Sequence, residues 1–397
     1  MKALAGTRIL DLTHMVSGPY CTQMLADSGA EVIKIEAPRY GEATRRLLEN
    51  DPKLSIEKMG AYFLTLGRNK KSMTLDLKKE EGIEVFHQLV KVSDVVIYNF
   101  RAGVGDKLGL SYKHLKELNP KIITCSITGF GETGPNSDRT SFDLVAQASG
   151  GSMFVTHGDE PYRAGVPIGD LGGGLMGAIG VLTALQARHN TGRGQHIDIS
   201  MQDAQISLLN YMATSYFLSG ESPPPIGNSH FAFVPYGTYK VKDGYIIVAI
   251  ITDQFWEDLM AVMELPEIHL EENRTKEGRL INKEKINQVL GDALLKQDSE
   301  YWIKLLSGKG IPCGPVHNLA GALNDPHVLA RNMVVEVEHP SGKKVKQVGN
   351  PIKMSETFEE TYNSPPLLGA DTNDILAGLL GFNDAAIDAL ENRGVTG

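Results

Sequence analysis

The chain has 397 residues, and its composition of 42% hydrophobic and 22% charged residues excludes a wholly disordered protein. The net charge of −9, from 39 basic and 48 acidic residues, excludes a general affinity for nucleic acids or anionic membranes. This length predicts two domains, or one domain with a large insertion.

The first half of the chain alternates short apolar segments with amphipathic ones, which predicts an α/β fold with a mostly parallel sheet. Strands are expected over residues 8–12, 31–36, 72–77, 94–100, 121–130 and 194–201. Helices are expected over residues 19–29, 79–92, 111–119, 142–149, 171–188 and 203–218.

A break in this pattern occurs at "SGESPPPIGN", residues 219–228, because three consecutive prolines cannot continue a helix or a central strand. Residues 236–250 then predict a hairpin that turns at Asp243-Gly244. Further helices are expected near 254–263, 283–296, 299–307 and 372–382.

The cysteine and histidine patterns favour a reducing, cytoplasmic setting without a metal site. Cys21, Cys125 and Cys313 show no CxxC spacing, and the 11 histidines show no paired ligand spacing. The first residues lack the apolar stretch of a signal peptide. The apolar segment 171–185 is shorter than the roughly 20 residues of a membrane span, so we expect a buried helix there.

One motif points to a different class of protein. "GFGETG", residues 129–134, matches the G-x-G-x-x-G pattern of a dinucleotide-binding turn, and Glu36 ends the second expected strand as a ribose-binding acid often does. However, Pro135 predicts a continuing loop where a helix should begin, and the turn at 13–19 has one glycine where three are needed. An NAD-dependent oxidoreductase remains an alternative.

Asp170 lies in "PIGDLGGGLMGAIG", residues 167–180, directly before a glycine-rich apolar run. Asp is a favoured N-cap residue, so the carboxylate has a purely structural explanation. It also has a chemical one, because the helix dipole would keep Asp170 ionised and nucleophilic. The amides of Gly172, Gly173 and Gly174 could then stabilise an oxyanion while the carboxylate attacks an acyl carbonyl. The residues alone leave both explanations open.

The chain as a whole resembles the class III coenzyme A transferases, the family of formyl-CoA transferase and carnitine CoA-transferase-like (CaiB/BaiF) enzymes. The resemblance rests on segments that occur in order along nearly the full chain. They are "GTRILDLTHMVSGPYCTQMLADSGAEVIKIEAP", "NKKSMTLDL", "VVIYNF", "SITGFGETGP", "VAQASGG", "GDLGGG", "TGRGQHIDISMQDA", "IPCGPVHN" and "PPLLGADT".

The resemblance implies that Asp170 is a catalytic nucleophile that forms a mixed anhydride and then an aspartyl-CoA thioester. Coenzyme A and acyl-CoA would be substrates, with no permanently bound cofactor and no metal. A small carboxylic acid would be the second substrate. The matching CoA-binding positions are Val16, Leu66, Gly67, Arg68, Asn69, Asn99, Phe100, Arg101, Lys107 and Arg139, with Arg39 and Lys70 as weaker candidates.

The family fold is a Rossmann-like large domain formed by both ends of the chain, with a smaller α+β domain inserted between them. By this resemblance, residues 1–222 and 319–397 form the large domain and residues 223–318 the smaller one. Two such chains are expected to form a homodimer of interlocked rings.

The same fold also occurs in α-methylacyl-CoA racemases, which need two opposed acid–base groups, typically a histidine and the aspartate. Ser141 occupies the position that corresponds to that histidine, which argues against an epimerase and leaves it as the second hypothesis. Formyl-CoA transferases carry a run of glycines in the loop that covers the site, and residues 226–237 lack it. His230 and Tyr236 in this segment are candidates for the acid pocket.

Overall fold

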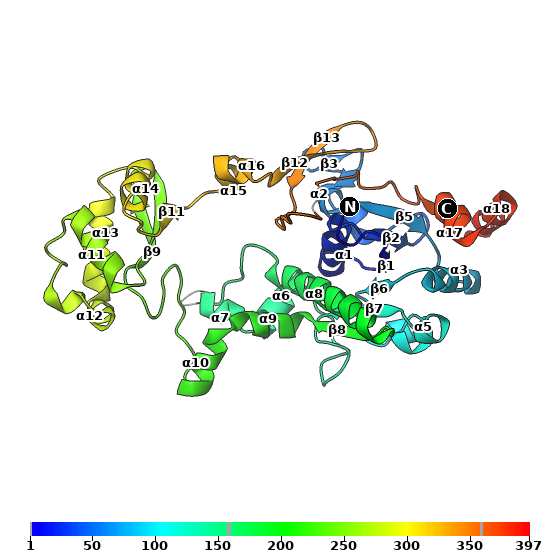
Figure 1. The fold of residues 1–397 in the computed structure, drawn as a ribbon, viewed down its shortest axis with the longest axis horizontal. Helices are drawn as coiled ribbons and strands as arrows, with labels where there is room; N and C mark the ends of the chain where they lie inside the picture. The colour runs from blue at the N-terminus through cyan, green and yellow to red at the C-terminus, as the bar shows by residue number, and fades with distance from the viewer. Residues whose placement is uncertain (1, 157–159, 358–359) are drawn as a thin grey trace. The chain divides into compact units, whose positions relative to one another are not determined.

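A computed structural model describes residues 2–156, 160–357 and 360–397. The chain divides into two compact units (Figure 1). The first comprises residues 1–152, 163–210 and 329–397, and the second comprises residues 153–162 and 211–328. The second unit therefore extends beyond both ends of 223–318, the range expected for the smaller domain.

Six parallel strands form the central sheet of the first unit, in the order β5-β2-β1-β6-β7-β8. They are β1 (Arg8–Asp11), β2 (Glu31–Glu36), β5 (Lys70–Thr74), β6 (Val95–Tyr98), β7 (Ile123–Thr128) and β8 (His196–Ser200). The strand order reverses between β1 and β6. In a doubly wound sheet this reversal opens a crevice at the carboxyl ends of the strands. The predicted α/β class with a parallel sheet is confirmed.

Helices cover both faces of this sheet. On one face, α1 (Ser17–Asp27) and α8 (Ile168–Thr191) pack over buried residues of β1, β6 and β7. The other face packs against α3 (Glu80–Lys91), α5 (Tyr112–Leu118), α17 (Thr372–Leu380) and α18 (Asp384–Asn392). Residues from both ends of the chain thus share one core, which brings the C-terminal helices beside the first strands (Figure 1).

Helix α8 lies unusually close to its neighbours because of its glycines. A Cβ atom at Gly174 would lie 2.6 Å from the carbonyl oxygen of Ser17, and one at Gly177 would lie 2.7 Å from Cδ1 of Ile127. By length and composition α8 could cross a membrane, yet 44% of its most apolar window is buried inside the protein. These contacts are those of a core helix, which agrees with the sequence prediction.

A buried ion cluster stands at the carboxyl end of β1. Asp11 lies 3.0 Å from Nζ of Lys70 and 3.8 Å from Nζ of Lys34, and all three side chains are buried. Burial alone would raise the pKa of Asp11, but the two ammonium groups and hydrogen bonds from Thr13 hold it well below its usual value. Lys34 also donates to the carbonyl of Thr13 at 2.8 Å. The cluster therefore fixes the start of the loop that leaves β1.

The second unit contains an antiparallel sheet in the order β11-β10-β9. The predicted hairpin is confirmed as β9 (Tyr236–Val241) and β10 (Gly244–Ala249), joined by β11 (Cys313–Pro315). Trp256 is fully buried in the core of this unit. The helices of this unit include α10 (Tyr211–Ser219), α11 (Asp253–Met263), α12 (Lys276–Ile281), α13 (Lys283–Leu294) and α14 (Ser299–Ser307).

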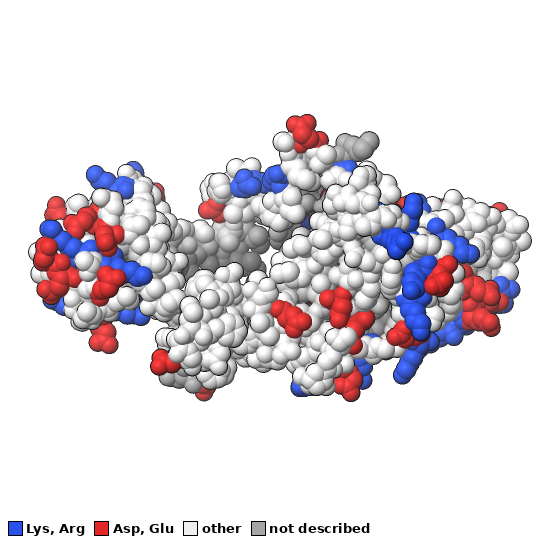
Figure 2. All heavy atoms as spheres, turned by 60° about the horizontal axis from the view of Figure 1, so that its bottom comes forward, with Lys and Arg blue, Asp and Glu red and all other residues white. Residues whose placement is uncertain are grey.

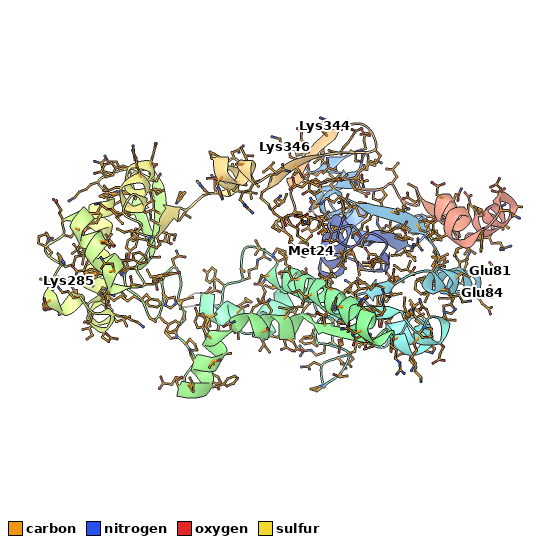
Figure 3. All side chains as sticks on the ribbon, viewed as in Figure 1. Met24, Glu81, Glu84, Lys285, Lys344 and Lys346 are labelled. Carbon is orange, nitrogen blue, oxygen red and sulfur yellow. The ribbon has the colours of Figure 1, made fainter. Side chains whose placement is uncertain are left out.

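After the second unit the chain returns through a hairpin of β12 (Val334–Glu338) and β13 (Lys344–Val348). Lys344 and Lys346 on β13 are exposed and project outward (Figure 3). The next residue, Gln347, points to the opposite face of the strand, where it is buried and donates to the carbonyl of Leu64 at 2.6 Å. Leu64 belongs to α2 (Ala61–Leu66), so this hairpin is attached to the first unit.

Two expected helices have different limits in the structure. The helix expected over 203–218 is split at Asn210, whose positive φ of 49° separates α9 (Met201–Leu209) from α10. The helix expected from residue 171 begins at Ile168, because Pro167 takes the N-cap position. As a result, Asp170 lies inside the first turn of α8 and is not its N-cap residue.

The space around two helical glycines, one on α8 and one on α17, predicts opposite effects for their substitution by alanine. We expect Gly174→Ala to destabilise the protein by about 1–3 kcal/mol, because the new methyl group would meet the backbone of α1. Gly378 on α17 has open space around it, so Gly378→Ala should stabilise by about 0.5–1 kcal/mol. Urea unfolding of both variants measures the difference. Equal stability of the two variants would contradict the close packing of α8.

Candidate active site

A pocket of about 220 Å³ lies in the first unit, where the strand order reverses. Its lining comes from the loops after β1, β6 and β7 and from the first turn of α8. Residues of the lining include His14, Met15, Asn99, Phe100, Arg101, Thr128, Gly129, Arg139, Thr140, Ser141, Phe142 and Asp170. Five sequence-predicted residues therefore meet in one pocket: Asp170, Asn99, Phe100, Arg101 and Arg139.

Asn99 joins the loops that follow β1 and β6. Its Oδ1 accepts the backbone N–H of His14 at 2.8 Å, and its Nδ2 donates to the carbonyl of His14 at 2.7 Å. The next residue, Phe100, packs between Tyr98 and His14, with ring centroids 5.9 Å from each. The Asn99 side chain, predicted to contact CoA, is therefore committed to holding the wall of the pocket.

Asp143 caps the helix that carries Asp170. Its Oδ1 accepts the N–H of Gly169 at 2.8 Å and the N–H of Asp170 at 3.3 Å. These are two of the free amides at the start of α8, which normally require a capping acceptor. Asp143 thus performs the structural role that the sequence suggested for Asp170. Among the described residues, the carboxylate of Asp170 has no hydrogen-bond partner.

Two buried glutamines hold this arrangement in place. Gln147 donates to Oδ2 of Asp143 at 2.8 Å and accepts the N–H of Ala164 at 2.9 Å. Gln205 donates to the carbonyl of Ile168 at 3.0 Å. Both side chains are at most 1% exposed. The sequence predicts no role for Asp143, Gln147 or Gln205, although "VAQASGG" contains Gln147 and "MQDA" directly precedes Gln205.

The surroundings of Asp170 disfavour its charged form. Burial, followed by the negative charge of Asp143, raises its pKa to about 7. The sequence led us to expect that the helix dipole keeps Asp170 ionised. Burial and the charge of Asp143 act against this expectation, and Asp143 already accepts the N–H groups of Gly169 and Asp170 at the start of the helix. Asp170 is a carboxyl group that titrates near neutral pH.

The glycines after Asp170 serve packing and do not supply an oxyanion site. The N–H of Leu171 donates to the carbonyl of Pro167 at 2.9 Å, and the amides that follow lie inside α8, each bonded four residues back. Gly172, Gly173 and Gly174 are buried, and a Cβ atom at Gly173 would lie 2.8 Å from Cγ of Met201. The predicted use of these three amides as oxyanion donors is therefore corrected.

Two exposed arginines give the pocket its positive charge. Arg101 lies two residues after Asn99, in the loop that follows β6, and is hydrogen-bonded to the hydroxyl of Thr140. Arg139 lies over the ring of Phe130 at 5.0 Å and donates to Oδ1 of Asn136 at 3.3 Å. Each guanidinium keeps further N–H donors beyond these bonds, so both can receive an anion.

Other predicted CoA-binding residues lie outside this pocket. Arg68 forms a buried ion pair with Asp27 at 2.6 Å, and Asn69 donates to the same carboxylate at 2.7 Å. These bonds attach the segment after α2 to α1, so the Arg68 guanidinium is already engaged. Val16 and Leu66 line a separate apolar cavity of about 510 Å³, which Arg68 also borders.

The remaining predicted positions are dispersed. Arg39 lines a cavity of about 660 Å³ with Lys78, Lys79 and Arg393, beside the carboxyl ends of β2 and β5. Lys107 is exposed at the end of the short helix α4 (Val104–Lys107). Gly67 is the C-cap residue of α2. Lys70 is buried in the Asp11 cluster and is not available to a ligand.

His230 and Tyr236 lie in the second unit, within an aromatic cluster. The imidazole of His230 packs against Phe231, Phe233 and Tyr236, with ring centroids 4.7, 4.8 and 5.1 Å away. Burial, and then the positive charge of Lys276, lowers the pKa of His230. The cluster is therefore a mainly neutral, aromatic surface within this unit.

The dinucleotide motif has another explanation in the structure. No helix begins within residues 129–134, and the loop continues to α6 (Asp143–Ser149). Glu132 in this loop pairs with His196 at 3.0 Å and accepts from the hydroxyl of Tyr98 at 3.4 Å. Glu36 is engaged by Arg45 at 2.6 Å. The motif thus attaches the loop to the sheet, and Glu36, the acid that would bind a ribose, is already paired with Arg45.

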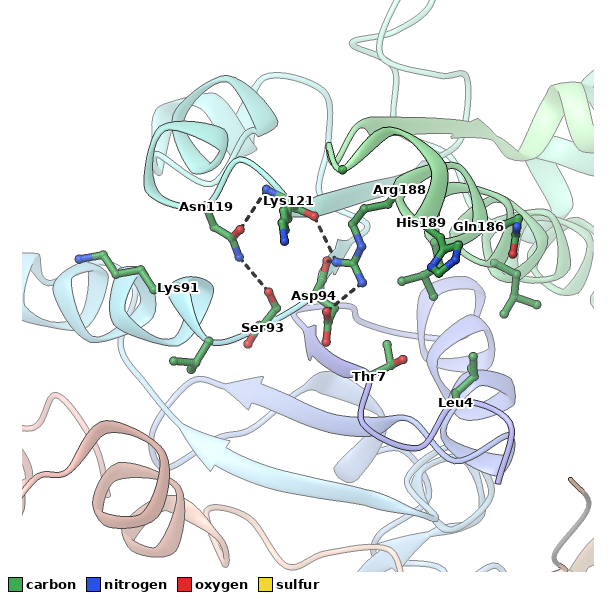
Figure 4. Close-up of a pocket in the computed structure, with 14 residues that line it drawn as sticks. Leu4, Thr7, Lys91, Ser93, Asp94, Asn119, Lys121, Gln186, Arg188 and His189 are labelled. Carbon is green, nitrogen blue, oxygen red and sulfur yellow. Dashed lines mark hydrogen bonds and ion pairs between the residues drawn. The ribbon is translucent and has the colours of Figure 1, made fainter. Parts of the chain in front are cut away.

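A larger cavity, of about 1090 Å³, lies at the opposite edge of the sheet, beside the amino ends of β6 and β7 (Figure 4). Its polar groups bind one another: Arg188 pairs with Asp94 at 2.9 Å and donates to the carbonyl of Lys121 at 3.2 Å. No sequence-predicted site residue lines it. The Asp170 pocket is therefore the stronger candidate for chemistry.

On the face visible in Figure 2, basic side chains of the first unit gather at the end that holds α3 and α5, with acidic side chains beside them.

The part of the chain that the structure describes contains no group of three His, Cys, Asp or Glu side chains placed to hold a metal ion.

Comparisons with known proteins agree over nearly the whole chain. The model of CoA-transferase family III matches residues 4–372. Succinyl-CoA:glutarate CoA-transferase of Homo sapiens is 35% identical over 398 residues, which cover 100% of this chain and 90% of that protein. Succinyl-CoA:mesaconate CoA-transferase of Haloarcula hispanica is 38% identical over 386 residues, covering 95% and 96%. The crystal structure of a CAIB/BAIF family protein from Brucella suis has a TM-score of 0.84 and 35% identity, covering 95% and 99%.

The raised pKa of Asp170 predicts that its charge destabilises the folded protein. The folded pKa exceeds the unfolded value near 3.9, so the ionisation penalty is complete above pH 7 and vanishes as pH falls toward 4. Because Asp170 is partly exposed, we expect Asp170→Asn to stabilise the protein by about 1–2 kcal/mol at pH 8 and by little at pH 4. Urea unfolding at both values measures this.

Asp374 provides a matched control for this measurement, because it occupies the same third position of α17 and is exposed. Asp374→Asn should cost a few tenths of a kcal/mol at pH 8, through loss of a favourable charge near a helix N-terminus. A stability gain in Asp170→Asn that is no larger at pH 8 than at pH 4 would contradict the assignment.

Proposed function

The chain belongs to CoA-transferase family III and is an enzyme that acts on acyl-CoA thioesters and carboxylic acids; we propose that it does so through covalent intermediates on Asp170. The resemblance inferred from the sequence motifs is thereby confirmed. The mechanism on Asp170 goes beyond the comparisons.

The observation that carries this mechanism is the isolation of the Asp170 carboxylate. It lines the pocket at the strand reversal, while Asp143 performs the capping of its helix. A nucleophile must keep its lone pairs available, and a carboxylate bound to helix amides would not. A pKa of about 7 also leaves a large ionised fraction at neutral pH and makes that ionised form more basic than an ordinary aspartate.

In the first half of the reaction, an Asp170 oxygen attacks the carbonyl carbon of the acyl-CoA donor. The carbon–sulfur bond breaks, the CoA thiolate leaves, and a mixed anhydride joins the acyl group to Asp170. The thiolate then attacks the aspartyl carbonyl of this anhydride. The donor acid leaves as a carboxylate, and Asp170 becomes a CoA thioester.

The second half reverses these steps with a different acid. The acceptor carboxylate attacks the aspartyl thioester, which releases the CoA thiolate and forms a second anhydride. The thiolate attacks the acceptor carbonyl, giving the new acyl-CoA and the free Asp170 carboxylate. Each intermediate retains the energy of the thioester, so the exchange needs no other source of energy and must exclude water.

We propose that CoA is held as a substrate along the loops at the carboxyl ends of the strands, the usual ligand position in a doubly wound sheet. Arg101 and Arg139 line the pocket and can pair with phosphate oxygens. Lys107 is available as an exposed cation, and Arg39 stands with other cations at the ends of β2 and β5. No permanently bound cofactor or metal enters these steps.

For the acids, we propose succinyl-CoA as donor and a short dicarboxylic acid as acceptor. The human and haloarchaeal relatives are named for succinyl-CoA, with glutarate and mesaconate as their acceptors. A pocket of about 220 Å³ with two arginines in its lining suits a small acid that carries a second negative charge. The second carboxylate would be stabilised by an arginine while the first one reacts.

We also propose that two chains form an interlocked homodimer and that the enzyme works in the cytoplasm. Support for the dimer comes from apolar side chains left exposed on α8 and α9, including Ile179 at 55%, Leu182 at 44% and Leu208 at 50%. The three cysteines are free thiols, which suits a reducing compartment.

An epimerase remains the second candidate, because His14 and Asp170 line the same pocket and could exchange a proton with one carbon. Ser141, at the position aligned with the racemase histidine, also lines it. The two functions differ in a simple measurement. An epimerase exchanges the α-hydrogen of an acyl-CoA with deuterium from solvent in the absence of an acceptor acid.

The mechanism predicts that Asp170→Ala abolishes transfer while CoA still binds. Incubation with succinyl-CoA, rapid acid quenching and mass spectrometry should show the succinyl or CoA adduct on the peptide containing Asp170 in the wild type only. Isothermal calorimetry should show CoA affinity within about twofold of the wild type, since the phosphates contact other residues. Asp374→Ala serves as the control and should keep full activity. Transfer by Asp170→Ala at the wild-type rate would disprove the nucleophile assignment.

The proposed acids predict a preference that depends on the second carboxylate. With succinyl-CoA as donor, we expect kcat/KM for glutarate to exceed that for valerate, a monocarboxylate with the same number of carbons, by at least about tenfold. The reason is that an arginine in the pocket would be left without its anion when valerate binds. Mass spectrometry of the CoA esters measures both rates. Equal values would contradict the dicarboxylate proposal without affecting the role of Asp170.

A further inference from the structure

The proposed reaction requires a hydrogen-bond donor for an oxyanion in the pocket, and the steps proposed on Asp170 assign no residue to this role. When Asp170 attacks a thioester, the carbonyl oxygen becomes an oxyanion that needs a hydrogen-bond donor. The amides of Gly172, Gly173 and Gly174 are used inside α8, and those of Gly169 and Asp170 are bound to Asp143. In this unit the donor must therefore come from elsewhere in the pocket lining.

We propose that His14 is a catalytic residue whose imidazole N–H donates a hydrogen bond to the carbonyl oxygen of the acyl group on its way to Asp170. This inference rests on the proposed function of Asp170. It assigns a role to the loop after β1 that none of the sequence motifs predicted.

The position of His14 supports this role. His14 and Asp170 line the same pocket of about 220 Å³, and the proposal places the reacting carbonyl between them. Among the described residues, neither ring nitrogen of His14 has a hydrogen-bond partner. By contrast, both polar atoms of Asn99 are bonded to the backbone of His14, and the hydroxyl of Ser141 donates to the carbonyl of Phe142.

The backbone around His14 is held at three successive residues. The carbonyl of Thr13 accepts from Lys34 at 2.8 Å, and Asn99 bonds both the N–H and the carbonyl of His14. The N–H of Met15 donates to Glu42 at 3.2 Å, and Met15 has a positive φ of 63°. The imidazole also packs against the ring of Phe100. A donor fixed in this way loses little entropy during the reaction.

The charge state of His14 suits a neutral donor. Burial, and then the positive charge of Lys34 on β2, lowers its pKa, while Asp11 on β1 and Glu36 on β2 act in the opposite direction. The lowered pKa favours the neutral ring, which carries one N–H. A neutral imidazole stabilises a developing oxyanion without neutralising the ionised Asp170 that must attack.

The decisive experiment measures single-turnover acylation of Asp170 by succinyl-CoA in rapid-quench flow at pH 8. We expect His14→Ala to slow acylation by about 30-fold or more while CoA affinity changes less than threefold. His14→Gln places an amide N–H at similar reach and should recover most of the lost rate. His114→Ala is the control, because His114 is an exposed residue of α5.

A spectroscopic readout separates this role from a structural one. In Asp170→Asn, which cannot be acylated, the Raman band of the thioester carbonyl should shift to lower frequency on binding, and His14→Ala in that background should reverse the shift. Acylation at the wild-type rate in His14→Ala, no recovery in His14→Gln, or an unchanged carbonyl band would each overturn the proposal for His14. Absence of any adduct on Asp170 in the wild type would instead overturn the proposed function.

Discussion

The bond between Asp143 and the first turn of α8 is the constraint on which the site depends. A helix N-terminus inside a protein needs an acceptor for its free amides, and the nearest acid in sequence is Asp170 itself. Asp143 accepts these amides from another element, at 2.8 and 3.3 Å, so Asp170 is left without a partner. Burial of the carboxyl group, and then the negative charge of Asp143, raises the pKa of Asp170 to about 7. One interaction thus frees the carboxyl group and contributes to its basicity.

The parallel sheet brings the other parts of the site together. Loops after β1, β6 and β7 emerge at one edge because parallel strands have their carboxyl ends there. Asn99 then binds the first two loops to each other, and the Asp11 cluster holds the base of the first. Glycines on α8 allow that helix to approach α1 closely enough to bring its first turn to the same edge. The position of Asp170 is therefore a consequence of packing far along α8.

Sequence reasoning predicted the parts of this site that leave a local signal. Alternation of strands and helices indicated the parallel sheet, and ordered motifs pointed to Asp170, Arg101 and Arg139, which the structure places in one pocket. The roles of Asp143 and of the glycine amides were not predictable, because a capping partner 26 residues away produces no periodic pattern. For the same reason the sequence indicates a helix dipole beside Asp170, but it shows neither the burial of this carboxyl group nor the nearby charge of Asp143, which together raise its pKa.

The charges of Asp170, of a bound substrate acid and of the two arginines in the pocket lining influence one another. An anionic acid that binds beside Asp170 adds a negative charge, which would raise the pKa of Asp170 further and leave less of the nucleophile ionised. A guanidinium that pairs with the bound anion neutralises the charge of that anion and so offsets this effect. Arg101 and Arg139 both line the pocket, while the chain as a whole has a net charge of −9. Under the proposed function, this local positive charge would attract an anionic substrate to an acidic protein and would keep Asp170 ionised once that substrate is bound.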